Sequence, residues 1–245
     1  MSQRRAFTGS SLIRELSRLT DAADPPLSRQ SFAERLSHWL GWTDAISLSS
    51  ALRGVPVDAS TGSHAGAAAE QAQCARVREA QTHAIAQEMR GVSRDAANDF
   101  PPYRRRYVAR QQAMESSIGP LRGRLRETLA ARSPAMARLA AVDAVMEQVV
   151  GPHESRLLST VPALLEQHFK RSRAVEAAAN TTHANDSNDS NDTDDINRIN
   201  NPDGGEARRA AWLNAFGQDM QSVLLAELDL RLQPVEGLLE ALRAS

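Results

Sequence analysis

The apolar spacing between residues 100 and 150 constrains the fold of this chain more than any other feature. Large side chains recur there at alternating steps of three and four residues, as in a helix that buries one stripe: Tyr107, Met114, Ile118, Leu121 and Leu125. Pro101 and Pro102 precede the stripe, where the missing N–H of proline removes no helical hydrogen bond. The pattern predicts one long amphipathic helix in which Gly119-Pro120 causes a kink near Ser116.

A second apolar stripe follows the short junction Ala131-Arg132-Ser133-Pro134. Ser133 suits the N-cap of a new helix and Pro134 suits its first position. We expect Gly151-Pro152 to end this helix. Because so few residues join the two helices, we expect an antiparallel hairpin that packs Ile118, Leu121 and Leu125 against Leu139, Val142 and Met146. One broken long helix is the alternative.

The same region is strongly basic. Nine arginines lie between residues 100 and 139 against two glutamates, a net charge of +7 in a chain whose formal net charge is −1. This predicts a basic face for phosphates, anionic lipid or an acidic protein, with these candidate partner-binding residues: Tyr103, Arg104, Arg105, Arg106, Tyr107, Arg110, Arg122 and Arg126. A solvated helix face is the plainer interpretation, because arginine is a good helix former and Lys170 is the chain's only lysine.

Composition favours an all-α fold, because aromatic residues make up only 4% of the chain and no run of β-branched residues alternates with period two. We expect a helical bundle with long antiparallel, coiled-coil-like helices and a small N-terminal helical unit. The expected organisation is a compact three-helix unit (1–54), a flexible linker (55–69), a helical hairpin or bundle (70–179), a disordered acidic Asn/Asp-rich insertion (180–205) and a C-terminal helix packing on the bundle (206–245).

The C-terminal helix has the most apolar stripe of the chain. We expect it to contact neighbours on more than one side or to carry a surface for another chain, and we expect Pro234 to bend it.

The sequence lacks the patterns of common catalytic and metal sites. No glycine-rich phosphate loop occurs, no two histidines have zinc-ligand spacing, and Cys74 is the only cysteine. We therefore expect no catalytic residue, no cofactor and no metal, and a protein that is not an enzyme. The absence of an apolar segment of signal-peptide or membrane-span length predicts a cytoplasmic protein without membrane insertion.

Two motifs suggest a more specific function, but each lacks residues that the motif requires. A tight turn at Gly41 suggests a DNA-reading helix-turn-helix, but the helix after it carries only Arg53 as a basic residue. Asp186, Asn188 and Ser190 suggest a calcium loop, but the required glycine and the closing glutamate are missing.

Three segments carry a family resemblance: RQSFAERLSHWLGWTDAISLSSAL (29–52), DFPPYRRRYVARQQAMESSIGPLRGRLRETLAARSPAMARLAAVDAVMEQVVG (99–151) and DMQSVLLAELDLRLQPVEGLLEAL (219–242). Together they resemble an uncharacterised proteobacterial family catalogued only as a domain of unknown function. The resemblance implies no catalytic residue. It implies an accessory role beside an envelope complex with stator-like membrane helices and a peptidoglycan-binding module like that of outer-membrane protein A.

These observations leave three hypotheses. The first is a cytoplasmic protein-interaction or accessory protein whose candidate partners include membrane-complex proteins. The partner docks on the arginine-rich face or on spare apolar surface of the last helix. The second is a nucleic-acid-associated protein that uses the same arginines with Tyr103 and Tyr107. The third is a self-assembling coiled-coil scaffold, that is, a homo-oligomer.

Overall fold

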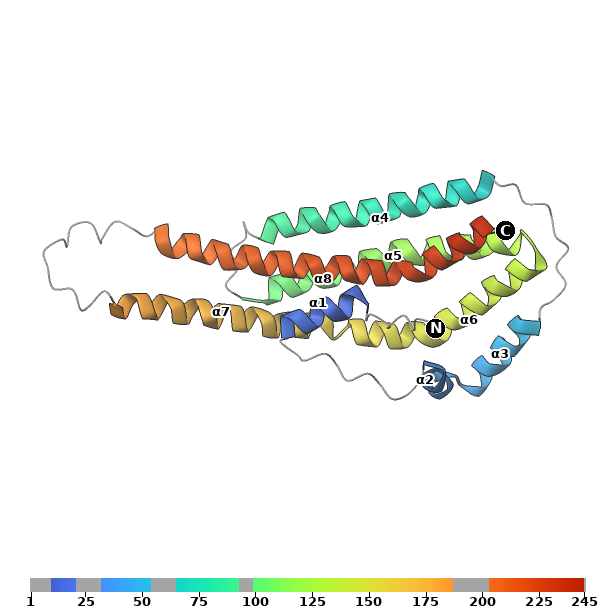
Figure 1. Ribbon diagram of the computed structural model, residues 1–245, viewed down its shortest axis with the longest axis horizontal. Coiled ribbons are helices and arrows are strands. Elements are labelled where there is room, and N and C mark those ends of the chain that lie inside the picture. The colour runs from blue at the N-terminus through green and yellow to red at the C-terminus, as the bar shows by residue number, and fades with distance from the viewer. Residues whose placement is uncertain (1–9, 21–31, 54–64, 93–98, 187–202, 245) are drawn as a thin grey trace, which may run out of the picture.

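The computed structural model describes residues 10–20, 32–53, 65–92, 99–186 and 203–244, and this part of the chain is all-α. Its eight helices follow one another as α1 (Ser11–Thr20), α2 (Phe32–Trp39), α3 (Trp42–Arg53), α4 (Ala65–Val92), α5 (Pro101–Ala130), α6 (Pro134–Leu158), α7 (Val161–Asp186) and α8 (Asp203–Ala244). The long helices form an elongated bundle, and α7 and α8 reach farther than α4 and α5 at one end (Figure 1). The expected all-α helical bundle is confirmed.

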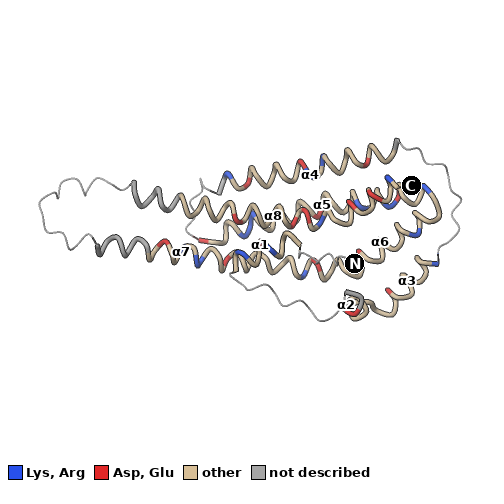
Figure 2. Tube along the Cα trace, in the orientation of Figure 1, with Lys and Arg blue, Asp and Glu red and all other residues tan. Residues whose placement is uncertain are grey.

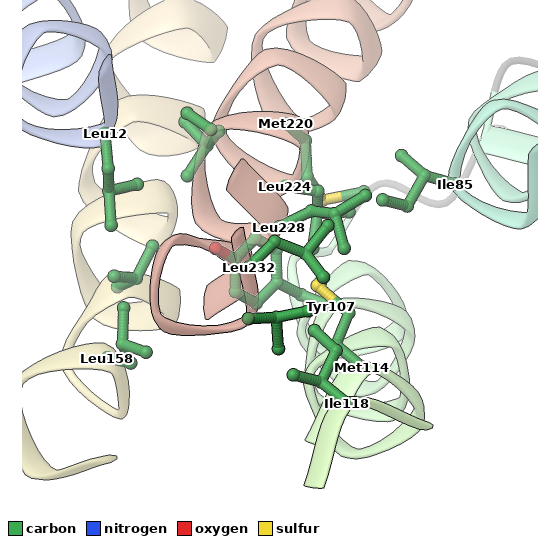
Figure 3. Packing of buried hydrophobic residues seen from close by; sticks show 14 of the residues in the cluster. Leu12, Ile85, Tyr107, Met114, Ile118, Leu158, Met220, Leu224, Leu228 and Leu232 are labelled. Carbon is green, nitrogen blue, oxygen red and sulfur yellow. The ribbon is translucent and has the colours of Figure 1, made fainter. Parts of the chain in front are cut away.

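The C-terminal helix α8 is the centre of this bundle. It contacts α1, α4, α5, α6 and α7, so its apolar residues are covered from several sides. Side chains of α5 (Tyr107, Met114 and Ile118) and of α8 (Leu224, Leu228 and Leu232) point toward one another (Figure 3). Ile85 of α4, Leu12 of α1 and Leu158 of α6 cover the sides of this contact. The exposed large apolar side chains of the described residues all lie outside α8. The proposed spare apolar surface on the last helix is therefore wrong, because the chain buries that surface itself.

An aromatic cluster fixes one end of the core. Phe100, Tyr103, Phe169 and Phe216 come from the start of α5 and from α7 and α8, with ring centroids 5.1–6.5 Å apart. Such tilted and edge-to-face pairs add about 0.5–1.5 kcal/mol each to the burial of the rings. The sequence analysis placed Tyr103 and Tyr107 on a partner-binding face, and both are buried instead.

Helices α5 and α6 form the expected antiparallel hairpin, since Gln111 lies near Leu158 while Arg122 lies near Asp143. Ser133 caps α6 by accepting a hydrogen bond from Met136 N at 3.2 Å. The expected apolar contact between the helices is not the one observed. Leu139 is exposed, Val142 and Met146 are only half-buried, and the α6 residues that join the main core are Ala140 and Leu158.

The opposite side of α6 packs on the N-terminal helices. At 100° per residue, Val145, Val149 and His153 project away from Ala140. Helix α3 contacts α6, and Trp39 of α2 stacks on His153 with ring centroids 4.4 Å apart. Val145 and Val149 are buried outside the main core cluster. The buried residues on this side of α6 thus differ from the expected stripe of Leu139, Val142 and Met146.

The structure differs from the expected compact unit of residues 1–54. Helix α1 contacts α7 and α8, where Leu12 and Leu19 join the main core, whereas α3 contacts α6 (Figure 1). The reason is that the central bundle offers apolar surface to each of these short amphipathic helices separately.

Several helix, linker and insertion boundaries also differ from those expected from the sequence. Helix α6 continues through Pro152 to Leu158, and α5 and α8 likewise contain Pro120 and Pro234. A proline removes only one hydrogen bond from a helix that its neighbours hold in place. Of the expected linker 55–69, residues 65–69 belong to α4, and of the expected insertion 180–205, residues 180–186 and 203–205 belong to α7 and α8. The remaining residues of both segments lie outside the described part.

Candidate functional site

The expected arginine-rich face is divided among different surroundings. Arg122 and Arg126 turn toward α6, where Arg122 Nη2 lies 2.7 Å from Asp143 Oδ1 and Arg126 Nε lies 2.8 Å from Asp143 Oδ2. Glu147 pairs with both guanidinium groups. These two arginines join α5 to α6 and are largely withdrawn from solvent, so they do not form a surface with the other candidates.

The remaining candidates lie at the N-terminal half of α5. Arg104 and Arg105 are exposed and form no ion pair with the described residues, whereas Arg106 Nε lies 3.5 Å from Glu88 Oε1 of α4. Arg110 is half-buried on the same side of the helix as Arg106. Figure 2 shows basic and acidic positions interspersed along the bundle. The structure therefore brings together Arg106 and Arg110 but separates them from Arg122 and Arg126.

The most deeply buried charged group among the described residues, Glu227 of α8, was not predicted from the sequence. Its side chain is 0% exposed. It accepts hydrogen bonds from Tyr107 Oη at 2.7 Å, from Gln111 Nε2 at 3.0 Å and from Arg231 Nε at 2.9 Å. Burial, and then the Glu227 charge, raise the pKa of Tyr107 well above its usual value. We call these four residues the Glu227 cluster.

A sequence signal for the Glu227 cluster does exist. Glu227 interrupts the apolar stripe of α8 one turn before Arg231, and Tyr107 and Gln111 stand one turn apart on the stripe of α5. A carboxylate inside one stripe and two hydrogen-bond donors inside another indicate that the two stripes meet. Helices α5 and α8 are separated by more than a hundred residues in sequence, so the spacing within each helix does not by itself predict that they pair.

A cavity of about 220 Å³ adjoins the Glu227 cluster between α5, α6 and α8. Its charged lining comprises Glu115, Arg122, Glu147, Glu154 and Arg231. Burial raises the pKa of Glu154, and the nearby Arg231 and Arg122 oppose that effect. Because three carboxylates and two guanidinium groups line the cavity, the lining does not favour a ligand of one charge.

A second polar network ties α1 to the bundle. Asp219 Oδ2 lies 2.7 Å from His168 Nε2, and Asp219 Oδ1 accepts a 2.7 Å hydrogen bond from Arg18 Nη2. Arg171 donates to the carbonyl oxygens of Leu19 and Thr20 at the end of α1. These contacts connect three helices, so His168 and Asp219 have structural partners.

The outward side of α3 is apolar and uncovered by the described residues. Trp42 is 83% exposed, Ile46 is 52% exposed and Leu52 is 61% exposed. Trp42 and Ile46 are one turn apart on one side, and Leu52 lies on its flank, so the three span an arc of about 120° on the helix. We call these three residues the Trp42 face. Trp39, only three residues earlier, points the other way onto His153.

Within the described ranges, no three His, Cys, Asp or Glu side chains form a group that could hold a metal ion. None of the helices there is both long and apolar enough to cross a membrane.

Comparison with curated proteins and with solved structures finds no match to this chain. A family model does match, over residues 1–244, and its description is "Protein of unknown function (DUF3348)". That range includes the three segments whose resemblance was noted from the sequence. The chain therefore belongs to the DUF3348 family of proteins of unknown function.

Proposed function

We propose that this chain is a non-catalytic interaction protein that binds another protein through the Trp42 face. The observation that carries the proposal is a tryptophan left 83% exposed beside two further exposed apolar side chains on one short helix. Contiguous exposed apolar residues mark interaction sites, and tryptophan is the residue type most enriched among those that dominate binding energy. The bundle would then act as a rigid support for α2 and α3.

The occupant that we propose is an amphipathic helix of the partner protein. Helix α3 has 12 residues, which gives the face a length of about 18 Å at 1.5 Å per residue. Its charged residues, Asp44 and Arg53, stand near the two ends, so the middle of the helix is uncharged. A stripe whose charged residues stand only near its ends matches the apolar stripe of another helix packing alongside it.

Photo-crosslinking from the intact chain in its own cells tests this proposal. A benzoylphenylalanine at Ile46 reports on the Trp42 face, and the same residue at Val175, which is also exposed but lies on α7, is the matched control. We expect a crosslink from position 46 to an amphipathic helix of a different protein, absent from position 175 and lost in Trp42→Ala. Equal labelling from both positions contradicts the proposal, and crosslinks solely to a second copy replace the partner protein with a homo-oligomer.

A folding control separates binding from stability. Trp42→Ala removes an exposed side chain, so we expect the free energy of unfolding to change by less than about 0.5 kcal/mol. Trp39→Ala removes the stacking on His153 and is expected to loosen α2 from α6. Loss of the crosslink in Trp42→Ala with an unchanged urea midpoint then reports the contact itself.

A nucleic-acid partner is the second candidate, favoured by the exposed Arg104 and Arg105. Tyr103 and Tyr107 are buried and so cannot stack on bases. Two phosphate contacts give a logarithmic salt dependence with a slope of only about −2. Co-purification with and without nuclease distinguishes the candidates: partners lost on nuclease treatment support nucleic acid, and retained partners support a protein.

The cellular setting is part of the same proposal. The sequence resemblance suggests a cytoplasmic accessory of an envelope complex, and the retained partners would then include proteins with membrane helices. The non-catalytic role is supported by the Glu227 cluster, because the carboxylate of Glu227 is occupied by hydrogen bonds from Tyr107, Gln111 and Arg231. A partner set without envelope proteins would remove the envelope setting but leave the Trp42 face in place.

A further inference from the structure

The two sides of α4 differ in chemistry. Toward α8 it buries Cys74, Ile85 and Met89, and Arg78 pairs with Asp229 and Glu236. Toward α5 its contacts are polar: Gln81 Nε2 donates to Ser117 Oγ at 3.1 Å, Glu70 lies 3.9 Å from Arg124, and Glu88 lies 3.5 Å from Arg106. Helix α4 is therefore held by α8, and its contact with α5 is a polar seam.

Buried polar atoms without a hydrogen-bond partner gather on this seam. Such side-chain atoms on α4 and α5 include Glu70 Oε2, Gln81 Oε1 and Arg110 Nε. Leaving a buried polar group unsatisfied costs about 1–3 kcal/mol. The Arg110 case matters most, because Arg110 has no ion pair with the described residues and its Nε donor is buried.

Arg110 faces a hollow between the two helices. The hollow has a volume of about 340 Å³ and is lined by Ala84, Gln87, Glu88, Arg106 and Arg110. The two arginines are one helical turn apart, so their guanidinium groups reach the same space. Glu88 supplies the one carboxylate of the lining and lies nearer to Arg106. The lining thus keeps a net positive charge, which the exposed Arg104 and Arg105 reinforce from the same turn of α5.

We propose that this hollow binds a phosphate group, either as free phosphate or as a phosphomonoester. Arg110 provides the unused guanidinium donors, Arg106 provides a second guanidinium, and the Gln87 amide provides a neutral donor. Two guanidinium groups offer more donors than the two oxygens of a carboxylate accept in one plane, whereas a phosphate presents three oxygens in three directions. Glu88 acts as an internal competitor that covers Arg106 when the hollow is empty.

Calorimetric titration of the full chain with inorganic phosphate and with phosphoserine tests the site, in a buffer of low ionic strength. We expect saturable binding by the wild type. Arg110→Gln is expected to weaken it by roughly tenfold or more, because it removes charge-assisted hydrogen bonds. Glu88→Gln is expected to strengthen it, because the competitor loses its charge. Tighter binding of phosphoserine identifies a phosphomonoester, and tighter binding of inorganic phosphate identifies the free ion.

Arg105→Gln is the matched control, because it removes the same charge from the same half of α5, five residues before Arg110. At 100° per residue its side chain projects away from Arg106 and the hollow, so we expect less than about a twofold change in affinity. Equal weakening by Arg105→Gln and Arg110→Gln would show a general effect of charge and overturn the site. An absence of saturable binding, or acetate binding as tightly as phosphate, would overturn the assignment to phosphate.

Discussion

Replacing Glu227 with leucine should destabilise the bundle by about 3 kcal/mol. The change leaves the buried Tyr107 hydroxyl and the Arg231 guanidinium without their acceptor, whereas Gln111 keeps the Leu158 carbonyl oxygen at 3.1 Å. Removing one partner of a buried charge pair costs about 3–5 kcal/mol. We expect the lower end of that range because the Arg231 side chain is still 13% exposed, and because the new leucine adds apolar burial.

A triple variant tests the physical reason for that loss. Tyr107→Phe, Glu227→Leu and Arg231→Met together remove the acceptor and two of its three donors, so neither member of the Glu227–Arg231 ion pair is left without the other. Replacing a whole buried ionic network with apolar residues of similar size is often neutral or stabilising. We therefore expect the triple variant to recover to within about 1 kcal/mol of the wild type.

Equilibrium urea unfolding, followed by circular dichroism at 222 nm, measures both variants. The dependence of unfolding free energy on urea should be unchanged, which shows that the native and unfolded states expose the same surface as before. A loss smaller than about 1 kcal/mol in Glu227→Leu would refute the claim that the cluster is buried and mutually satisfied. A triple variant as unstable as Glu227→Leu would instead show that the loss came from packing.

Three further predictions concern single groups. Because the pKa of Tyr107 is raised in the fold, the folded chain keeps a proton that the unfolded chain releases above pH ~10. The free energy of unfolding should therefore fall as the pH rises beyond that value, and it should fall less steeply in Tyr107→Phe. Urea midpoints measured across that pH range test both expectations. The raised pKa of Glu154 means that its charged form destabilises the fold above the unfolded pKa, so Glu154→Gln should raise the melting temperature at pH 7 but not at pH 3. Asp143→Ala leaves the two largely buried arginines Arg122 and Arg126 with only the more exposed Glu147 as an ion-pair partner among the described residues, and it should cost about 2 kcal/mol. Asp229→Ala breaks a more exposed pair with Arg78 and should cost less than about 1 kcal/mol in the same urea assay.

The features that could be predicted from the sequence are those set by neighbours along the chain. The stripe of α5 and the stripe of α8 are visible because each repeats every three or four residues, and the Ser133 cap needs only the three residues that follow it. The hairpin of α5 and α6 is the simplest packing for two helices joined by so short a junction.

The features that could not be predicted depend on residues far apart in the chain. Arg122 and Arg105 look alike in sequence, but Asp143 meets one of them and no described carboxylate pairs with the other. The stripe of α6 that includes Leu139 was assigned to α5 because α5 is its neighbour in sequence, yet Ala140 and Leu158 are the buried α6 residues in the shared core. The N-terminal helices were grouped together because they are close in the chain, although α1 finds more apolar surface on α7 and α8.

The two proposed binding sites lie on different sides of the bundle, and this placement predicts how they behave together. Helix α4 and the hollow beside Arg110 are separated from α3 and Trp42 by the core that α5, α6 and α8 form (Figure 1). Changes at well-separated sites add independently unless an element between them has two arrangements. Saturating phosphate should therefore leave partner affinity at the Trp42 face unchanged, and Trp42→Ala should leave phosphate affinity unchanged. A coupling free energy above about 1 kcal/mol would mean that the bundle shifts between two packings, and by reciprocity it would appear in both titrations.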